Sequence, residues 1–548
     1  MAAGARLSIP EPLPVTVTPG AAAGSLLDQK LKKSPNRLGI LVFGAALVIG
    51  LGYVGSQLAH DLSGTHLLSA WPYLLLGLAL LIALGFEFVN GFHDTANAVA
   101  TVIYTHSLEP NFAVVWSGMW NLIGVLTSSG AVAFTILSLL PVELILQVGK
   151  GAGFAMVFSL LIAAILWNLS TWWFGLPASS SHTLIGSIIG VGVANQLMNP
   201  HTGTSGVDWG QAANVFKVLL ISPLVGFGCA AVFLLILKFF VKNKALYESP
   251  KGTEPPPFWI RCLLILTCTG VSFGHGSNDG QKGMGLIMLI LIGTVPTAYA
   301  LNHAIGYSQV QNFAAVSEQT AGVLSHYIVP GTSTYGDPRE VVTDYIRTKE
   351  FNFNTMLALH SMVQEIETEV ISYKSLASVP GPQQQNIRNN MYVVSEALRL
   401  MNKSHQPAIS AADNQVLTNY KKFLDNSTKF IPTWVKVAVA LALGLGTMVG
   451  WKRIVVTVGE KIGKEHLTYA QGAAAEIVAA ATIIGADHFH MPVSTTHVLS
   501  SGVAGTMTAN GSGLQMATIR NIALAWVFTL PAAALLAGGI FFVMRQFM

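Results

Sequence analysis

A carboxylate stands in the middle of a membrane-length apolar stretch of this sequence. Asp94 lies in the segment Gly91-Phe92-His93-Asp94-Thr95-Ala96-Asn97-Ala98-Val99-Ala100, between the apolar runs 71–89 and 99–104. An ionisable side chain at that depth is energetically unfavourable, and where one occurs it commonly binds an ion or relays a proton. The alternative is a helix end at the membrane surface with Asp94 facing water, because a helix can break at a glycine such as Gly91.

A second carboxylate occupies a matching stretch. Gly276-Ser277-Asn278-Asp279 repeats Gly91-Phe92-His93-Asp94, with the aspartates 185 residues apart. A hydroxyl-rich motif also recurs in the same order, 315 residues apart, as Pro177-Ala178-Ser179-Ser180-Ser181-His182 and Pro492-Val493-Ser494-Thr495-Thr496-His497. The two offsets differ by 130 residues, which is close to the length of a polar region at 298–431. One insertion therefore reconciles both alignments, and the chain is predicted to be an internal duplication.

The hydroxyl-rich motifs predict anion binding. Each follows a proline and precedes an apolar helical run, so the hydroxyl residues are expected at the N-cap and first turn of a half-helix. Free backbone N–H groups and the helix dipole at such an end attract anions. Six side chains would add hydroxyl donors: Ser179, Ser180, Ser181, Ser494, Thr495 and Thr496. A role limited to capping the helix ends is the alternative.

Two carboxylates beside an anion site call for a positive charge. Asp94 and Asp279 would repel a bare anion, so the pattern predicts a bound cation, which is sodium, a divalent metal such as magnesium, or a proton on a carboxylate. Asn97 and Asn278 are predicted to donate to the anion or to coordinate the cation. Lys282, one helical turn after Asp279, is predicted to pair with that carboxylate or to contact the anion.

Histidines give two further candidates. His182 and His497 occupy equivalent positions and are candidates for proton relay, with a packed structural role as the alternative. Asp487, His488 and His490 form a cluster before Pro492. A loop at the membrane surface explains this cluster more simply than a metal site does.

Composition places the duplication in a membrane. Only 10% of the residues are charged, against about 25% in soluble domains. The mean hydropathy is +0.54, and the apolar runs are long enough to cross a bilayer as helices. The net charge of +4 is small and spread out, so no nucleic-acid partner is expected. Neither Ser–His–Asp nor metalloprotease spacing occurs, which favours a non-enzymatic protein without a tightly bound cofactor.

Basic loops set the predicted orientation. The N-terminal tail and two connections rich in Lys and Arg, at 242–251 and 452–464, are expected in the cytoplasm. The connections 60–70 and 198–215 contain neither residue and are expected outside. The predicted apolar segments are 38–59, 71–106, 112–140, 154–175, 181–197, 216–240, 259–293, 433–450, 472–486, 493–509 and 521–544.

These segments predict an all-α polytopic membrane protein with inverted-topology repeats, broken acidic helices and two re-entrant-type hairpins. In such carriers the substrate site lies near the bilayer midplane. The N-terminus is predicted to be cytoplasmic and the C-terminus periplasmic. The parts are a disordered cytoplasmic tail (1–37), an extra transmembrane helix (38–59), the first transport repeat (71–240), the start of the second (259–297), a small periplasmic helical insertion (298–431) and the rest of the second repeat (432–544).

The paired motifs resemble those of the inorganic phosphate transporter (PiT) family, in particular its bacterial low-affinity carriers. The resembling residues are 91–100, 177–186, 274–283 and 491–497, and the likeness extends from about 71 to 544. The resemblance implies a bacterial inner-membrane symporter that imports inorganic phosphate, coupled to sodium or protons. Bacterial members are similar to proton symporters that accept a neutral metal–phosphate complex.

Two positions depart from the family pattern. His93 and Lys282 stand where the family commonly has asparagine, which argues against a sodium site and favours protons. A sodium-coupled phosphate symporter and a cation exchanger with acidic inverted repeats stay open, as does a membrane sensor that reads a ligand through its outside domain. The oligomeric state, including a homo-oligomer, is left open by the sequence.

Overall fold

The computed structural model describes residues 37–63, 71–146, 151–199, 206–250, 254–329, 331 and 336–547. Within these ranges the side chains of residues 37, 38, 71, 72, 95–97, 142 and 143 are not described. The predicted tail therefore falls outside the description except for Arg37, with which the first helix begins.

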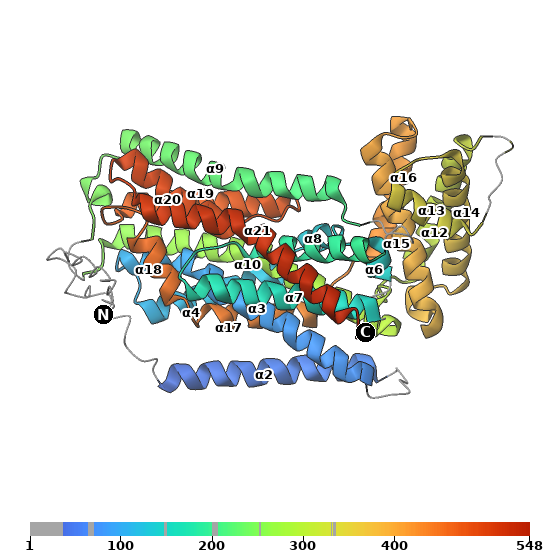
Figure 1. Ribbon diagram of the computed structural model, residues 1–548, viewed down its shortest axis with the longest axis horizontal. Coiled ribbons are helices and arrows are strands. Elements are labelled where there is room, and N and C mark those ends of the chain that lie inside the picture. Colours follow the sequence, from blue (N-terminus) through green and yellow to red (C-terminus); the bar gives the residue numbers. More distant parts are fainter. Residues whose placement is uncertain are drawn as a thin grey trace, which may run out of the picture.

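The described chain is helical, without a β-strand (Figure 1). The helices outside the insertion are α2 (Arg37–Leu62), α3 (Trp71–Tyr104), α4 (Pro110–Thr127), α5 (Ala131–Leu137), α6 (Val142–Leu146), α7 (Gly151–Trp173), α8 (Ser180–Met198), α9 (Trp209–Phe240), η1 (Lys244–Tyr247), α10 (Phe258–Thr294), α11 (Pro296–Tyr299), α17 (Thr433–Thr447), α18 (Lys452–Glu460), α19 (Tyr469–His488), α20 (Thr495–Asn510) and α21 (Met516–Met544).

Among the described residues, seven helices are long and apolar enough to cross a membrane, and up to nine spans result if each of two bent helix pairs is counted as one. Large apolar side chains such as Leu41, Leu224 and Leu535 are exposed on these helices. In water that exposure would be unfavourable, and a bilayer removes the penalty. The all-helical membrane fold predicted from the sequence is confirmed.

The acidic helices are not broken, contrary to the prediction. α3 runs without interruption past Asp94, and α10 runs past Asp279. Gly91 was named as a point where the first helix could break. Instead, Gly91 and the equivalent Gly276 are contact points at which another helix comes close. The predicted segment 112–140 does contain a break, because α4 and α5 are bent by 78° relative to each other.

Helices from the two halves of the chain pack against each other at glycine residues. A Cβ on Gly91 would lie 2.3 Å from the carbonyl oxygen of Leu443 on α17, and a Cβ on Gly276 would lie 2.1 Å from that of Asn121 on α4. Only glycine permits backbones to approach so closely. Gly446 faces Phe88 and Gly124 faces Phe273 in the same way. Each acidic helix thus packs on a helix from the opposite half of the chain.

The two acidic helices run in opposite directions. Arg261, at the start of α10, donates from Nε to the carbonyl oxygen of Ser107 at 2.8 Å, and Ser107 lies just beyond the end of α3. Figure 1 shows the same exchange elsewhere, with α8 alongside α21 and α20 alongside α9.

The polar region forms a helical unit at one end of the bundle, on the right of Figure 1. Its elements are α12 (Tyr307–His326), α13 (Pro338–Thr348), α14 (Phe353–Ser372), η2 (Leu376–Ser378), α15 (Gly381–Ser404) and α16 (Ala411–Thr428). Apolar side chains on α14, α15 and α16 form its buried core, with Met356, Leu359, Met391 and Tyr420 each fully enclosed. The sequence reasoning did not identify α12 and α13.

The first helix lies along the edge of the bundle. α2 is largely exposed, and its last turn is held by Asp61, which accepts hydrogen bonds from the Tyr299 hydroxyl at 2.6 Å and the Trp434 indole N–H at 3.1 Å. These partners come from α11 and α17, next to the insertion. α2 contributes no side chain to the site described below.

Candidate substrate and cation site

The two hydroxyl-rich motifs begin half-helices, as predicted. Ser179 is the N-cap of α8 and Ser494 is the N-cap of α20, and the side chain of each accepts from the backbone N–H of the histidine three residues on, at 3.2 Å. Pro177 and Pro492 lie in the extended segments before the caps. Both half-helices begin beside the two acidic helices.

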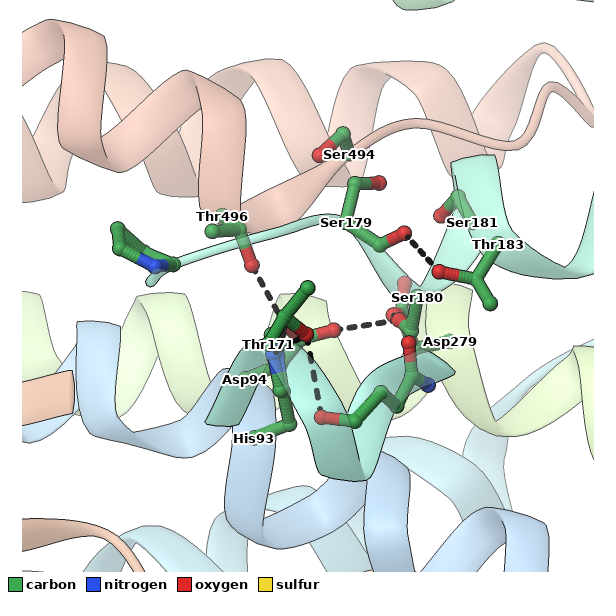
Figure 2. Close-up of polar contacts among 12 residues, drawn as sticks. His93, Asp94, Thr171, Ser179, Ser180, Ser181, Thr183, Asp279, Ser494 and Thr496 are labelled. Atoms are coloured by element: carbon green, nitrogen blue, oxygen red, sulfur yellow. Dashed lines mark hydrogen bonds and ion pairs between the residues drawn. The ribbon is translucent and has the colours of Figure 1, made fainter. Parts of the chain in front are cut away.

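Asp94 receives donors from both half-helices (Figure 2). The Ser180 hydroxyl on α8 donates to Asp94 Oδ2 at 2.5 Å, and the Thr496 hydroxyl on α20 donates to Asp94 Oδ1 at 2.6 Å. His93 Nδ1 lies 3.0 Å from Oδ1, and its Nε2 contacts the Thr171 hydroxyl at 3.1 Å. The carboxylate is 3% exposed, so these groups replace water around it.

Asp279 lies beside Asp94 and pairs with a lysine. Lys282 Nζ is 2.6 Å from Asp279 Oδ2, so the ion pair considered from the sequence is present. The same ammonium donates to the Ser181 hydroxyl at 2.5 Å. The Ser180 hydroxyl, 3.4 Å from Asp279 Oδ2, also reaches this carboxylate. One serine therefore lies within hydrogen-bonding distance of both acids.

Asn278 fastens the second hairpin to α10. Its side-chain amide donates to the carbonyl oxygen of Met491 at 3.1 Å and accepts from the backbone N–H of Val493 at 3.3 Å. Ser181 donates to the carbonyl oxygen of Val493 at 2.9 Å, which ties the two hairpins together. Asn97 lies in α3, but its side chain is outside the described residues.

The predicted hydroxyls are therefore mostly engaged with protein groups. The Ser180 and Thr496 hydroxyls donate to Asp94, and the Ser181 hydroxyl accepts from Lys282. Ser179 and Ser494 cap helices. Thr495 differs, because its buried hydroxyl oxygen has no hydrogen-bond partner among the described residues. An anion could be held by these donors only after the carboxylates give some of them up.

His275 is a site residue that the sequence reasoning missed. Its Nε2 lies 3.6 Å from Asp279 Oδ2 and 4.0 Å from Asp94 Oδ2, and its Nδ1 contacts Asn121 Oδ1 at 2.8 Å. The position four residues before Asp279, on the same helix face, was a signal that could have found it. Ligand atoms of Asp94, His275 and Asp279 all lie within 4.8 Å of one another, a donor set that fits a cation.

Asp487 also has a different role from the one expected. It was grouped with His488 and His490 in a surface loop, yet it ends α19 and accepts hydrogen bonds from Ser277 and Gln281, both at 2.6 Å. These donors lie on α10 on either side of Asp279. Asp487 therefore holds the acidic helix against the second hairpin, whereas the two histidines are exposed.

The equivalent histidines pack together. The rings of His182 and His497 lie 4.5 Å apart between centroids, and His497 stacks on Trp526 at 4.1 Å. Trp526 donates to the carbonyl oxygen of Pro177 at 2.9 Å. This stack joins the first turns of both half-helices, so the packed structural role is present in the geometry.

The site is closed to solvent and carries an uneven charge. Asp279 and Thr496 are 0% exposed, and Lys282 is 1% exposed. With both carboxylates ionised and neutral imidazoles, Lys282 offsets one of the two negative charges. Buried charge of one sign is strongly unfavourable unless it is compensated. One bound cation would therefore neutralise the remaining negative charge of the site. An anion could bind there only together with further positive charge.

Comparison with known proteins identifies the chain's relatives. Residues 90–537 match the sequence profile described as the phosphate transporter family. The chain belongs to the phosphate transporter family. The family indicated by the motifs is therefore confirmed.

Named bacterial transporters of this kind are similar along nearly their whole length. The low-affinity inorganic phosphate transporters PitA and PitB of Escherichia coli K12 are 45% and 42% identical to the chain, with 87% of the chain covered in each case and 97% and 98% of the relatives. A probable low-affinity inorganic phosphate transporter of Bacillus subtilis is 28% identical, with 86% and 97% covered.

A solved structure described as the sodium-dependent phosphate transporter is also similar, with a TM-score of 0.47 and 17% identity. The likeness covers 86% of this chain and 100% of that one. In the present chain, the family match at residues 90–537 contains Asp94 and the last part of α3, the whole of α10, and both hairpins.

Proposed function

We propose that this protein is a secondary active transporter that imports inorganic phosphate by cation-coupled symport. The observation that carries the proposal is the placement of Ser180, which donates to Asp94 at 2.5 Å and lies 3.4 Å from Asp279. One hydroxyl from a half-helix N-terminus thus stands between the two acids. Membership of the phosphate transporter family indicates that the anion is phosphate.

The charge balance explains why anion and cation would enter together. Cation binding by Asp94, His275 and Asp279 would weaken the hold of these carboxylates on Ser180 and Thr496. The freed hydroxyls, with Thr495, Ser179, Ser494 and the N–H groups of both half-helix ends, would then face a phosphate. Phosphate without a cation would meet uncompensated carboxylates, which is the physical basis of coupling.

The closed site requires movement. Because Asp94 and Asp279 are buried on every side, phosphate can enter only when helices part, first on one face of the membrane and then on the other. The exchanged packing and opposite directions of α3 and α10 support an inverted-topology repeat, the architecture in which alternating access is common. The hairpins α7–α8 and α19–α20 are the elements that would move against the acidic helices.

A proton is the proposed coupling ion. His93 contacts Asp94 at 3.0 Å, and Lys282 contacts Asp279 at 2.6 Å. Asp279 Oδ1 has no hydrogen-bond partner among the described residues. One open oxygen is enough for a proton, whereas a metal cation needs several oxygen ligands. A divalent metal such as magnesium would travel with phosphate as a neutral complex and would not be a tightly bound cofactor.

The proposed setting is the inner membrane of a bacterium. The basic loops place the N-terminus in the cytoplasm and the insertion and C-terminus in the periplasm. Figure 1 supports a shared side for the insertion and the C-terminus, since α21 ends on the side of the bundle that carries the insertion. Phosphate and the lipid bilayer are the proposed partners, and the exposed face of α2 is available to lipid or to a second copy.

Uptake of labelled phosphate into proteoliposomes, with proton, sodium and magnesium gradients imposed one at a time, tests the proposal. Uptake driven by an inward proton gradient is expected. Asp94→Asn and Asp279→Asn should each reduce it at least about 100-fold, because both groups hold the cation. Asp344→Asn, an exposed aspartate in the insertion, is the matched control and should transport normally.

A cation exchanger is the alternative, favoured by the Asp94–His275–Asp279 cluster. Cation flux that is independent of phosphate would support the exchanger and contradict symport. Sodium-driven phosphate uptake would support phosphate as the substrate but contradict the proton as the coupling ion.

A further inference from the structure

A cavity of about 540 Å³ lies between the insertion and the transport helices. The transport wall comes from the bend between α4 and α5, from Leu289 and Ile292 on α10, and from His490. The other wall comes from α15 and α16 of the insertion. None of the residues lining this cavity belongs to the buried site around Asp94 and Asp279.

The cavity carries a surplus of positive charge. Its lining includes five cations and two carboxylates, Arg388, Arg399, Lys421, Lys422 and Lys429 against Glu396 and Asp425. Burial alone would raise the pKa of Asp425, but the neighbouring Lys429 and Lys421 hold it below its usual range, so the carboxylate is ionised at neutral pH. Ion pairs join Arg399 to Glu396 at 2.6 Å and Lys429 to Asp425 at 2.8 Å.

Arg388 has no such partner among the described residues. It is 5% exposed, and its Nε has no hydrogen-bond acceptor. Its guanidinium lies 4.8 Å over the Tyr392 ring and donates from one terminal nitrogen to Asn389 Oδ1 at 3.1 Å. A buried cation without a counter-charge is unfavourable. A planar guanidinium with free donors matches the oxygens of a phosphate group.

We propose that this cavity is a second anion site that binds inorganic phosphate. Arg388 would donate to the phosphate oxygens, and Lys422 would add charge from the rim, where it is exposed. The site lies near the central one. Leu289 follows Asp279 by ten residues on α10, about 15 Å along the helix axis. His490 precedes Met491, whose carbonyl oxygen binds Asn278.

The cavity would hold phosphate at the insertion-facing side before the anion moves to the buried site. This transfer rests on the proposed transport function, but binding in the cavity does not. The two sites can therefore be tested separately in the full-length protein.

Equilibrium binding of labelled phosphate to the protein in neutral-lipid nanodiscs tests the proposal. Two binding steps are expected. Arg388→Gln should weaken one step at least about 10-fold, the scale of a lost charge-assisted bond. Ser180→Ala, which removes a hydroxyl proposed to face phosphate in the buried site, should weaken the other. A single step that Ser180→Ala removes and Arg388→Gln leaves intact overturns the cavity site and leaves the transport proposal standing. A single step lost only in Arg388→Gln supports the cavity and contradicts the central site.

Matched variants control for folding and charge. Arg339→Gln changes an exposed arginine of the same insertion outside the cavity and should keep both steps. Lys422→Gln changes an exposed rim residue that the fold tolerates, and should weaken the cavity step several-fold and reduce its salt dependence. Unchanged cavity binding in both Arg388→Gln and Lys422→Gln overturns the proposal. Loss of the cavity step in nanodiscs of anionic phospholipid would assign the cavity to a lipid headgroup and also overturn it.

Discussion

Two hydroxyl donors on one buried carboxylate are the central feature of the proposed site at the residue scale. Ser180 and Thr496 come from different halves of the chain, yet both donate to Asp94. Neither residue can hold phosphate and satisfy an ionised Asp94 at the same time. Competition between the acid and the anion for these two hydrogens is therefore a simple way to link cation binding to phosphate binding.

Ser180→Ala tests this link. The change removes the hydroxyl that lies within hydrogen-bonding distance of both acids. The kcat/KM of phosphate uptake is expected to fall about 10- to 100-fold, the scale of one or two lost hydrogen bonds to charged groups. Ser187→Ala is the control, because Ser187 is a buried serine on the same helix whose hydroxyl bonds, within the described part of the chain, only to the Thr183 carbonyl oxygen, at 2.9 Å. Equal uptake by the two variants would exclude a special role for Ser180.

The Lys282–Asp279 pair gives a second prediction at this scale. Lys282→Gln leaves Asp279 buried without its cation, which is expected to destabilise the protein by about 3–5 kcal/mol. Asp279→Asn combined with Lys282→Gln removes both charges and should recover most of that stability while uptake stays lost. Melting temperatures of the single and double variants in detergent measure the non-additivity. Additive losses would mean that the two side chains do not stabilise each other.

At the element scale, glycine decides how the acidic helices are placed. Gly91 brings α3 onto α17, and Gly276 brings α10 onto α4, so each aspartate sits one turn from a close backbone contact. The helices stay continuous because the neighbouring helix occupies the space that a side chain would fill. Asp94 and Asp279 are thereby held face to face.

Gly91→Ala is expected to destabilise the fold and reduce uptake. The added Cβ would lie 2.3 Å from the Leu443 carbonyl oxygen, so α17 must shift, at a cost of about 1–3 kcal/mol. Gly85→Ala on the same helix meets nothing within 4 Å and should be neutral or slightly stabilising. The apparent melting temperature in detergent and the yield in membranes compare the two. A stable, active Gly91→Ala protein would contradict the close packing.

Much of this arrangement could be predicted from residue patterns. The half-helix N-caps and the closeness of the two aspartates follow from motifs that are local in sequence. The unbroken acidic helices could not be foreseen, because whether Gly91 breaks a helix depends on Leu443, more than 350 residues away. The role of Asp487 was missed for the same reason, since it comes from contacts between α10 and α19. His275 could have been found from its position four residues before Asp279 on the same helix.

At the scale of the whole molecule, one aspartate ties the insertion to the transport helices. Asp208 caps α9 by accepting from the Gln211 N–H at 3.1 Å. It also pairs with Lys349 and Arg399 of the insertion, both at 3.2 Å. Burial alone would raise the pKa of Asp208, but the Gln211 hydrogen bond and the two cations hold it below its ordinary value.

This tie predicts a pH-dependent contribution to stability. Because the folded-state pKa of Asp208 is lowered, its contribution is present above the unfolded-state pKa near about 4 and is lost as the pH falls through the folded-state pKa. Asp208→Asn keeps the cap but loses the charge, and should lower stability by on the order of 1 kcal/mol at pH 7. Melting temperatures of variant and parent should converge at acid pH, once the pH is below the lowered folded-state pKa of Asp208. A difference that does not change with pH would contradict the assignment, and Asp344→Asn is the control.

The exchanged partners also determine when the protein can finish folding during its synthesis. α3 needs α17, α4 needs α10, and α8 needs α21, so the helices from α2 to α9 emerge before any of those partners exists. They can pack on one another in the bilayer, but Asp94 still lacks Thr496. A chain that stops inside the insertion has α10 to pack on α4, yet it lacks α17, α20 and α21. The buried site is therefore expected to be completed only late in translation, when the last helices join both halves.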